Sequence, residues 1–303
     1  MKIIVAGGTG LIGSMLLKRL AGKNDIVLFT RNPKSAHKQF EGAGFQIMSW
    51  DQPEEQLLGA IKNSDALINL SGAGIADSKW TPAQKQKLKN SRLKSIDKLV
   101  SLIKKAELHL KVVLQASAIG YYGNHAERIF TEDDAPGENF LAQLSMEWEK
   151  KAAKYLPFTD RLILLRTGVV LTPEGGALKP LMQPFKFFAG GKMGSGSQWV
   201  SWIDMEDQIG AILFLLSHNN SNGAYNLTAP KAIRQQELAS AIGKAMKRPN
   251  WLPVPGFVLK MLMGQMAEEM LLEGAHVMPK RLLDAGFEFQ SPDIDIALSH
   301  LLS

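Results

Sequence analysis

A glycine-rich turn near the start of the chain has the residue types and spacing that bind a pyrophosphate. Residues 7–13 read Gly-Gly-Thr-Gly-Leu-Ile-Gly, which satisfies the spacing G-x-G-x-x-G after a short apolar run. Glycines permit a tight turn, and a helix that starts there presents unpaired N–H groups and a positive dipole end. The alternative is a glycine-rich connection that binds nothing. The residues predicted to hold a dinucleotide phosphate are Gly7, Thr9, Gly10, Leu11, Ile12 and Gly13.

The residues after the second apolar run favour NADP over NAD as the dinucleotide. A site selective for NAD usually carries Asp or Glu there, on the ribose 2′-hydroxyl. This chain instead has Thr30 and Arg31, followed by Asn32, Pro33 and Lys34. A guanidinium can pair with a 2′-phosphate and a threonine can add a hydroxyl, so we predict NADP rather than NAD. The alternative is an arginine that is simply exposed after a strand.

Alternating strands and helices must position these residues. Runs rich in Val, Ile and Leu predict strands at 2–6, 25–30, 45–50, 66–70, 111–116 and 161–171. Their lack of polar alternation is typical of strands buried on both faces of a parallel sheet. Helical patterns lie between them at 10–20, 82–106 and 140–155, and Thr81 is a suitable N-cap for the second. This repetition predicts an α/β fold, a Rossmann doubly wound parallel sheet.

The pattern changes after residue 171. Residues 172–200 are rich in Gly and Pro and predict a substrate-side loop, in which Trp199 and Trp202 could form an aromatic wall or belong to the core. Lys179, Lys186 and Lys192 could meet an anionic ligand there. A short strand follows at 224–228, and the rest is mostly helical. We predict a Rossmann domain over residues 1–230, including loop 172–200, and a small helical C-terminal module over 231–303 on the substrate side.

Composition excludes several classes of protein. The chain has 303 residues, no cysteine, and 35 Lys+Arg against 29 Asp+Glu, which gives a net charge of +6. Without Cys there is no disulfide scaffold or thiol nucleophile, and the six His are scattered, so we expect no metal site. No apolar run is long enough to span a membrane and no basic stripe is interleaved with aromatics. We therefore expect a cytoplasmic protein with neither a membrane nor a nucleic acid as partner.

Motifs along the whole chain resemble one protein family. Beside residues 7–13 they include Asn-Leu-Ser-Gly at 69–72, Ser-Arg-Leu at 91–93, Ser-Ala-Ile-Gly-Tyr-Tyr-Gly at 117–123, Trp-Glu at 148–149 and Arg-Thr-Gly-Val-Val-Leu at 166–171. Later ones are Gly-Ser-Gly at 194–196, Trp-Ile-Asp at 202–204 and Leu-Leu-Glu-Gly at 271–274. The chain resembles the extended, atypical branch of the short-chain dehydrogenase/reductase superfamily. More narrowly, it resembles the NAD(P)-dependent epimerase family proteins that carry a helical C-terminal module.

The resemblance implies an NADP-type dinucleotide across the C-terminal ends of the strands. It assigns the pyrophosphate to the 7–13 turn and the ribose phosphate to Thr30 and Arg31. It also implies that Val170 ends the sixth strand beside the nicotinamide. The remaining cofactor contacts that it implies are Leu70, Ser71 and Gly72 at the end of the fourth strand and Arg92 on the long helix.

The superfamily's usual catalytic pair is absent. A Tyr and a Lys spaced Y-x-x-x-K should open the helix near residue 140, where the tyrosine moves a proton while hydride moves at the nicotinamide. Both registers fail, because residues 141 and 145 are Leu and Ser, and residues 140 and 144 are Phe and Leu. We predict Ser117, Tyr121 and Tyr122 as substitutes, with one tyrosine from this turn supplying the acid. The alternative is one buried ring and one ring at the rim of the site.

Two functions remain open. The first is an NADP(H)-dependent oxidoreductase or epimerase-like enzyme acting on an unknown small substrate, which could be anionic. The second is a non-catalytic NADP(H)-binding sensor or partner-binding protein, which the missing Tyr and Lys favour. The sequence leaves the substrate and the oligomeric state open.

Overall fold

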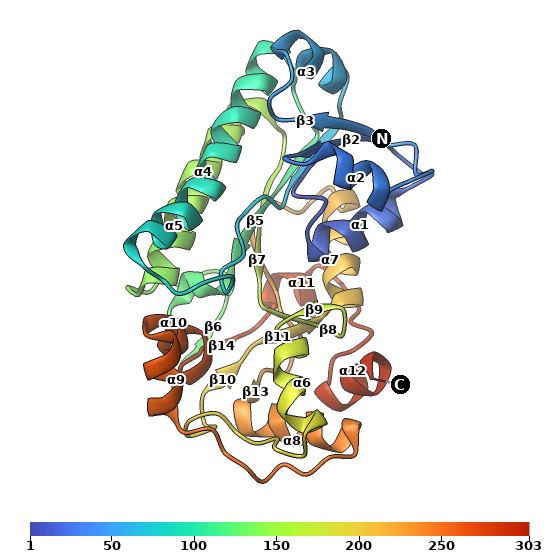
Figure 1. Ribbon diagram of the computed structural model, residues 1–303. Coiled ribbons are helices and arrows are strands. Elements are labelled where there is room, and N and C mark those ends of the chain that lie inside the picture. Colours follow the sequence, from blue (N-terminus) through green and yellow to red (C-terminus); the bar gives the residue numbers. More distant parts are fainter. Residues whose placement is uncertain (303) are drawn as a thin grey trace.

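A seven-stranded parallel sheet forms the centre of the computed structural model, which describes residues 1–302 (Figure 1). Its strands are β1 (Lys2–Ala6), β2 (Asp25–Thr30), β3 (Gln46–Ser49), β4 (Ala66–Asn69), β5 (Val112–Ala118), β7 (Leu162–Thr167) and β12 (Gly223–Leu227). Their order is β3-β2-β1-β4-β5-β7-β12, and every neighbouring pair is parallel. The order reverses between β1 and β4, which confirms the predicted doubly wound fold.

Helices cover both faces of this sheet (Figure 1). On β1, Ile3 and Val5 join one core while Ile4 and Ala6 join the other, so the strand is apolar at every position. The first face packs against α1 (Leu11–Leu20), α2 (Pro33–Gln39), α7 (Met205–Ser217) and α11 (Lys280–Asp284). The second packs against α3 (Glu54–Ile61), α4 (Pro82–Lys105), α5 (Phe140–Ala152) and the 3-10 helix η2 (Ala153–Phe158).

The predicted strand 161–171 is broken in two. β7 ends at Thr167, and the chain then crosses at Gly168 to β8 (Val169–Thr172), which pairs with β11 (Trp202–Asp204) and β9 (Gly175–Gly176). A Cβ on Gly168 would lie 2.6 Å from the carbonyl oxygen of Ser201, so this crossing requires glycine. The prediction that Val170 ends the sixth strand is therefore wrong, because Val170 belongs to a separate three-stranded sheet.

The region predicted as loop 172–200 is partly helical. α6 (Leu178–Lys186) buries Leu178, Met182 and Phe185 in a third core, with α8 (Gln235–Met246) and α12 (Ile294–Leu301). Trp202 is fully buried in the same core, so it contributes nothing to the predicted aromatic wall. Lys179, Lys186 and Lys192 are exposed. Trp199 is half-buried, with its ring against His276.

The C-terminal helices are joined to earlier parts of the chain by short strand pairs. β14 (His276–Val277) pairs with β6 (Ile129–Phe130), and β13 (Ile233–Arg234) pairs with β10 (Trp199–Val200). The other C-terminal elements are α9 (Gly256–Met263), α10 (Gln265–Ala267) and a π-helical turn η3 (Glu268–Leu272). The predicted mostly helical C-terminal region is thus confirmed, and it packs over the ends of the strands (Figure 1).

Candidate functional site

Two glycines of the 7–13 turn are packed too closely for any other residue type. Gly7 has φ +81°, and a Cβ there would lie 2.5 Å from the carbonyl carbon of Leu70. A Cβ on Gly13 would lie 2.4 Å from the carbonyl oxygen of Gly7. The turn after β1 therefore lies directly against the segment after β4, at the point where the strand order reverses. Ligands of open parallel sheets bind at this point.

The N-terminus of α1 presents unpaired donors at this turn. Gly10 is the N-cap and supplies no side-chain acceptor. Within residues 1–302 the backbone N–H groups of Leu11, Ile12 and Gly13 have no hydrogen-bond acceptor. Thr9 is exposed beside them. Free amides at a positive dipole end suit a phosphate, so the cradle fits a dinucleotide pyrophosphate.

The end of β2 places Arg31 in solvent. Within residues 1–302 its guanidinium has no ion-pair or hydrogen-bond partner, so it is free to meet an anion. Thr30 is buried, and its hydroxyl accepts a hydrogen bond from the backbone N–H of Asn32 at 3.2 Å. A ligand could reach the Arg31 side chain more readily than the Thr30 hydroxyl.

The segment after β4 is held by a residue that the sequence analysis did not single out. Asn69 is fully buried at the end of the strand, and its side-chain oxygen accepts the backbone N–H of Ser71 at 3.1 Å. Its amide group donates to Gln115 on β5 at 2.8 Å. This bridge fixes Leu70 and Ser71 beside the glycine turn.

Arg92 on α4 lies under the same segment. Its guanidinium donates to the carbonyl oxygens of Ala73 and Leu88 at 3.2 and 3.0 Å, and it lies 4.9 Å from the ring of Trp148. A Cβ on Gly72 would lie 3.3 Å from the guanidinium carbon, so glycine leaves room for it. Burial lowers the pKa of Arg92 to about 10, which still leaves it charged at neutral pH. No carboxylate pairs with it within residues 1–302, so it can attract an anion to this edge.

A buried ion pair lies between α5 and β7. Glu149 accepts from Arg166 through both oxygens, at 2.8 Å from Nε and 2.9 Å from Nη2, and the two side chains are only 10% and 6% exposed. Burial opposes the charge on Arg166, but Glu149 raises its pKa above the ordinary value. Ser117 donates to the same carboxylate at 2.6 Å. Ser117 is 5% exposed and its hydroxyl is hydrogen-bonded inside the protein. Both observations argue against contact of this predicted catalytic residue with a substrate.

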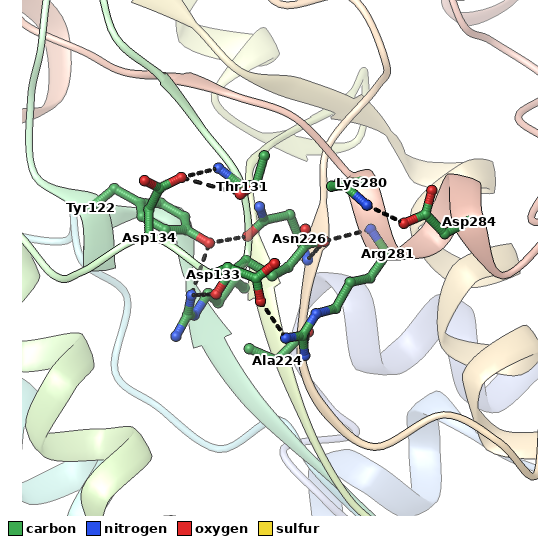
Figure 2. A network of polar contacts seen from close by, with 11 residues as sticks. Tyr122, Thr131, Asp133, Asp134, Ala224, Asn226, Lys280, Arg281 and Asp284 are labelled. Atoms are coloured by element: carbon green, nitrogen blue, oxygen red, sulfur yellow. Dashed lines mark hydrogen bonds and ion pairs between the residues drawn. The ribbon is translucent and has the colours of Figure 1, made fainter.

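The two tyrosines lie on η1 (Ile119–Tyr122), next to this ion pair. The Tyr122 hydroxyl donates to Asn226 at 2.7 Å and accepts from Arg166 Nη1 at 2.8 Å, and Figure 2 shows it pointing into this network. Burial raises the pKa of Tyr122 to about 12. This hydroxyl is therefore a poor proton donor to a substrate. The Tyr121 ring lies 3.6 Å from the Arg166 guanidinium, and its hydroxyl has no hydrogen-bond partner within residues 1–302.

The C-terminal region contacts the start of α5 through Glu269. Leu141 and Ser145 occupy the positions of the missing Tyr and Lys in one register. The carboxylate of Glu269 from η3 accepts the backbone N–H groups of Phe140 and Leu141 at 3.3 and 3.0 Å. The buried carboxylate of Glu269 thus lies beside position 141, where the superfamily would carry its catalytic tyrosine in this register.

A cavity of about 700 Å³ lies elsewhere, on the C-terminal module. Its walls include Lys192, Ser240, Asn250, Trp251 and Asp295, none of which follows a strand of the main sheet. This cavity does not extend to the glycine turn. No helix among residues 1–302 has both the length and the apolar character needed to cross a bilayer.

Comparison with known proteins agrees with this geometry. The model of the NAD dependent epimerase/dehydratase family matches residues 3–228, which is most of the chain. The chain belongs to this family. A second model, a domain of unknown function called DUF1731, matches residues 254–301 of the epimerase-family protein. The resemblance noted in the sequence is confirmed.

Several relatives match the epimerase-family protein over nearly its whole length. The protein ML0860 of Mycobacterium leprae is 36% identical over 98% of this chain and 94% of its own. The chloroplastic SDR39U1 homologue of Arabidopsis thaliana is 37% identical over 100% of this chain and 87% of its own. Both are described only as epimerase family proteins.

A crystal structure of the human epimerase family protein SDR39U1 (isoform 2) with NADPH has a TM-score of 0.87 to this chain. It is 28% identical, and the match covers 100% of this chain and 99% of the human one. UDP-glucose 4-epimerase of Thermotoga maritima shares the fold with a TM-score of 0.79 at 14% identity.

Proposed function

We propose that this epimerase-family protein is an NADP(H)-dependent oxidoreductase or epimerase-like enzyme for a small substrate, which could be anionic. The observation that carries the proposal is the glycine turn, where Gly7 touches Leu70 and α1 presents three free amides. The human relative, whose structure contains NADPH, supports the choice of cofactor. When bound, NADP(H) would supply hydride chemistry, while this chain's residues hold and orient it.

Arg31 provides the test of NADP over NAD. We expect calorimetric titration to show NADPH binding at least about tenfold more tightly than NADH, and Arg31→Ala to remove that preference. Lys38→Ala is the control, because it removes an exposed charge from α2 farther from the strand end. Equal affinity for both cofactors, or an unchanged preference in Arg31→Ala, would contradict the assignment.

For proton transfer the geometry favours Tyr121 over the other two predicted residues. Its hydroxyl is free, whereas those of Ser117 and Tyr122 are hydrogen-bonded inside the protein. In a screen of carbonyl compounds followed by NADPH oxidation, Tyr121→Phe should abolish turnover and leave cofactor affinity unchanged. Tyr122→Phe should lower stability but retain turnover. Full activity in Tyr121→Phe would exclude this tyrosine as the acid.

The second candidate is a cofactor-binding protein without turnover. It is favoured by Leu141 and Ser145 at the positions of the missing pair, and by the closure of α5 by Glu269. Two results together would support it. NADPH should bind tightly with no turnover across the screen, and a pull-down with this chain should retain a partner protein only in the presence of NADPH. No binding of either cofactor would refute both candidates.

A further inference from the structure

The C-terminal module and the end of α6 together carry a group of large apolar side chains that are exposed to solvent. Phe187 and Met261, for example, are 78% and 74% exposed. No residue of α9 is buried at all. We call this group the apolar rim, and it consists of Phe187, Phe188, Trp251, Leu252, Phe257, Met261 and Leu262. Exposed groups of this size on one region usually mark an interaction surface.

Hydrogen bonds join the end of α6 to the segment before α9, so Phe188, Trp251 and Leu252 lie close together. The indole N–H of Trp251 donates to the carbonyl oxygen of Phe188 at 3.0 Å. The backbone N–H groups of Trp251 and Leu252 both donate to Gly190, which follows the two phenylalanines closely. α9 starts four residues after Leu252. Figure 1 shows the end of α6, the segment before α9 and α9 itself at the same end of the molecule, far from α3.

The two segments that carry the apolar rim have basic residues but no acidic ones. Residues 175–203 and 238–267 contain no Asp or Glu, although they carry seven Lys and Arg. Glu174, Asp204, Glu237 and Glu268 directly flank these segments, and Lys244 and Lys260 pair with Asp295 and Glu268. The remaining five have no acidic partner within residues 1–302, and they are Lys179, Lys186, Lys192, Lys247 and Arg248.

We propose that the apolar rim docks on an anionic lipid surface, with α9 lying in the plane of the headgroups. Interfacial binding without a spanning segment combines apolar and aromatic side chains buried at the headgroup boundary with basic side chains that face the anionic lipids. Tryptophan favours this depth, and basic residues are attracted to anionic headgroups. From the lack of a spanning segment we expected no membrane partner. Docking on the membrane surface, however, does not require a spanning segment.

Charge argues against a second copy of this chain as the occupant. A two-fold contact through the apolar rim would bring the same unpaired basic residues of both copies close together, which is unfavourable. An anionic bilayer supplies the opposite charge over a wide, flat area.

Vesicle flotation tests the proposal on the full chain. Wild type should float with vesicles of phosphatidylcholine and phosphatidylglycerol, should float far less with phosphatidylcholine alone, and should dissociate as salt rises. Joint replacement of Phe187, Phe257 and Met261 by Ser should lower binding at least about tenfold. Joint replacement of Lys186, Lys192 and Lys247 by Gln should remove the preference for phosphatidylglycerol.

The control variant combines Leu156→Ser with Lys104→Gln. Leu156 is 56% exposed on η2, and Lys104 lies in the last turn of α4, so both are outside the apolar rim. This variant should float like wild type. Absence of flotation in wild type, or equal flotation of all variants, would overturn the proposal. A wild-type dimer that the serine variant dissociates, without lipid binding in either, would identify a second copy as the occupant.

Discussion

Replacing Glu149 by Gln tests whether the buried ion pair is structural. The side chains of Glu149 and Arg166 are 10% and 6% exposed, so the substitution leaves a buried guanidinium without its counterion. Breaking a buried pair by removing one partner costs about 3–5 kcal/mol. The Gln carbonyl keeps part of the hydrogen bonding, so we expect a loss of about 3 kcal/mol. For a chain of this size the midpoint of thermal unfolding should fall by about 6 °C.

Urea unfolding followed by far-UV circular dichroism measures this loss. Glu147→Gln is the matched control, because Glu147 is on the same helix and pairs with Lys89 at the surface, where it is 40% exposed. It should cost no more than about 1 kcal/mol. NADPH affinity of the folded Glu149→Gln protein should equal that of wild type.

A double substitution separates the ion pair from packing. Glu149→Leu together with Arg166→Met removes both charges, and a hydrophobic replacement of a buried pair is often tolerated. The double variant should be more stable than the sum of the two single losses predicts. If the losses add, or if Glu149→Gln costs no more than Glu147→Gln, the ion pair does not stabilise this interface and our reasoning is refuted.

Three further substitutions follow from single contacts. Gly13→Ala should abolish NADPH binding in calorimetry, because its Cβ would lie 2.4 Å from the Gly7 carbonyl; binding at wild-type affinity would contradict the assignment. Glu132 follows β6, is 5% exposed and accepts the backbone N–H groups of Asn226 and Arg281 at 3.0 and 3.2 Å. Burial raises the pKa of Glu132, so the folded protein keeps this proton to higher pH than the unfolded chain and loses stability as pH rises above about 4.5. In urea titrations Glu132→Gln should gain stability relative to wild type over this rise, and a constant difference would exclude the linkage. Glu269→Gln should cost about 1–2 kcal/mol in urea unfolding by weakening its hydrogen bonds to α5, and an unchanged midpoint would show that they contribute little.

Local signals predicted the central sheet well. β1 and β2 have the bounds read from the sequence, because strands buried on both faces are continuous apolar runs. α4 starts after Thr81, whose hydroxyl accepts the backbone N–H of Gln84 at 3.2 Å, as its capping pattern indicates. The glycine spacing likewise identified the turn after β1 by local geometry alone.

Features set by distant contacts were missed. The break at Gly168 depends on the close approach of Ser201, which lies far away in the sequence. A glycine inside a strand-like run can mark such an approach, but it does not show where the chain goes next. α6 has Pro184 inside it and glycines on both sides, so it resembles a loop until Phe185 is packed against α8. Tertiary burial here overrides local propensity.

The positions of the predicted cofactor residues could be inferred from the sequence more completely than those of the predicted catalytic residues, and the binding role of the former stays a prediction. Apart from Arg92 on α4 and Val170 on β8, the predicted cofactor residues lie at or after strand ends, where the sheet topology sets their position. Ser117 lies near the end of β5 and Tyr122 follows this strand, but their partners Glu149, Arg166 and Asn226 lie far away in the sequence. The motifs contained Glu149 and Arg166, yet only the fold shows that they pair.

The late pairing of short strands has a consequence for synthesis of the protein. β12 completes the edge of the main sheet only after an excursion of more than fifty residues from β7, and β14 pairs with β6 across a still longer separation. Much of the nascent chain therefore emerges from the ribosome before these contacts can form. Until then the outer edge of β7 is unpaired, so the nascent chain should depend on chaperones most strongly just before residues 223–277 emerge.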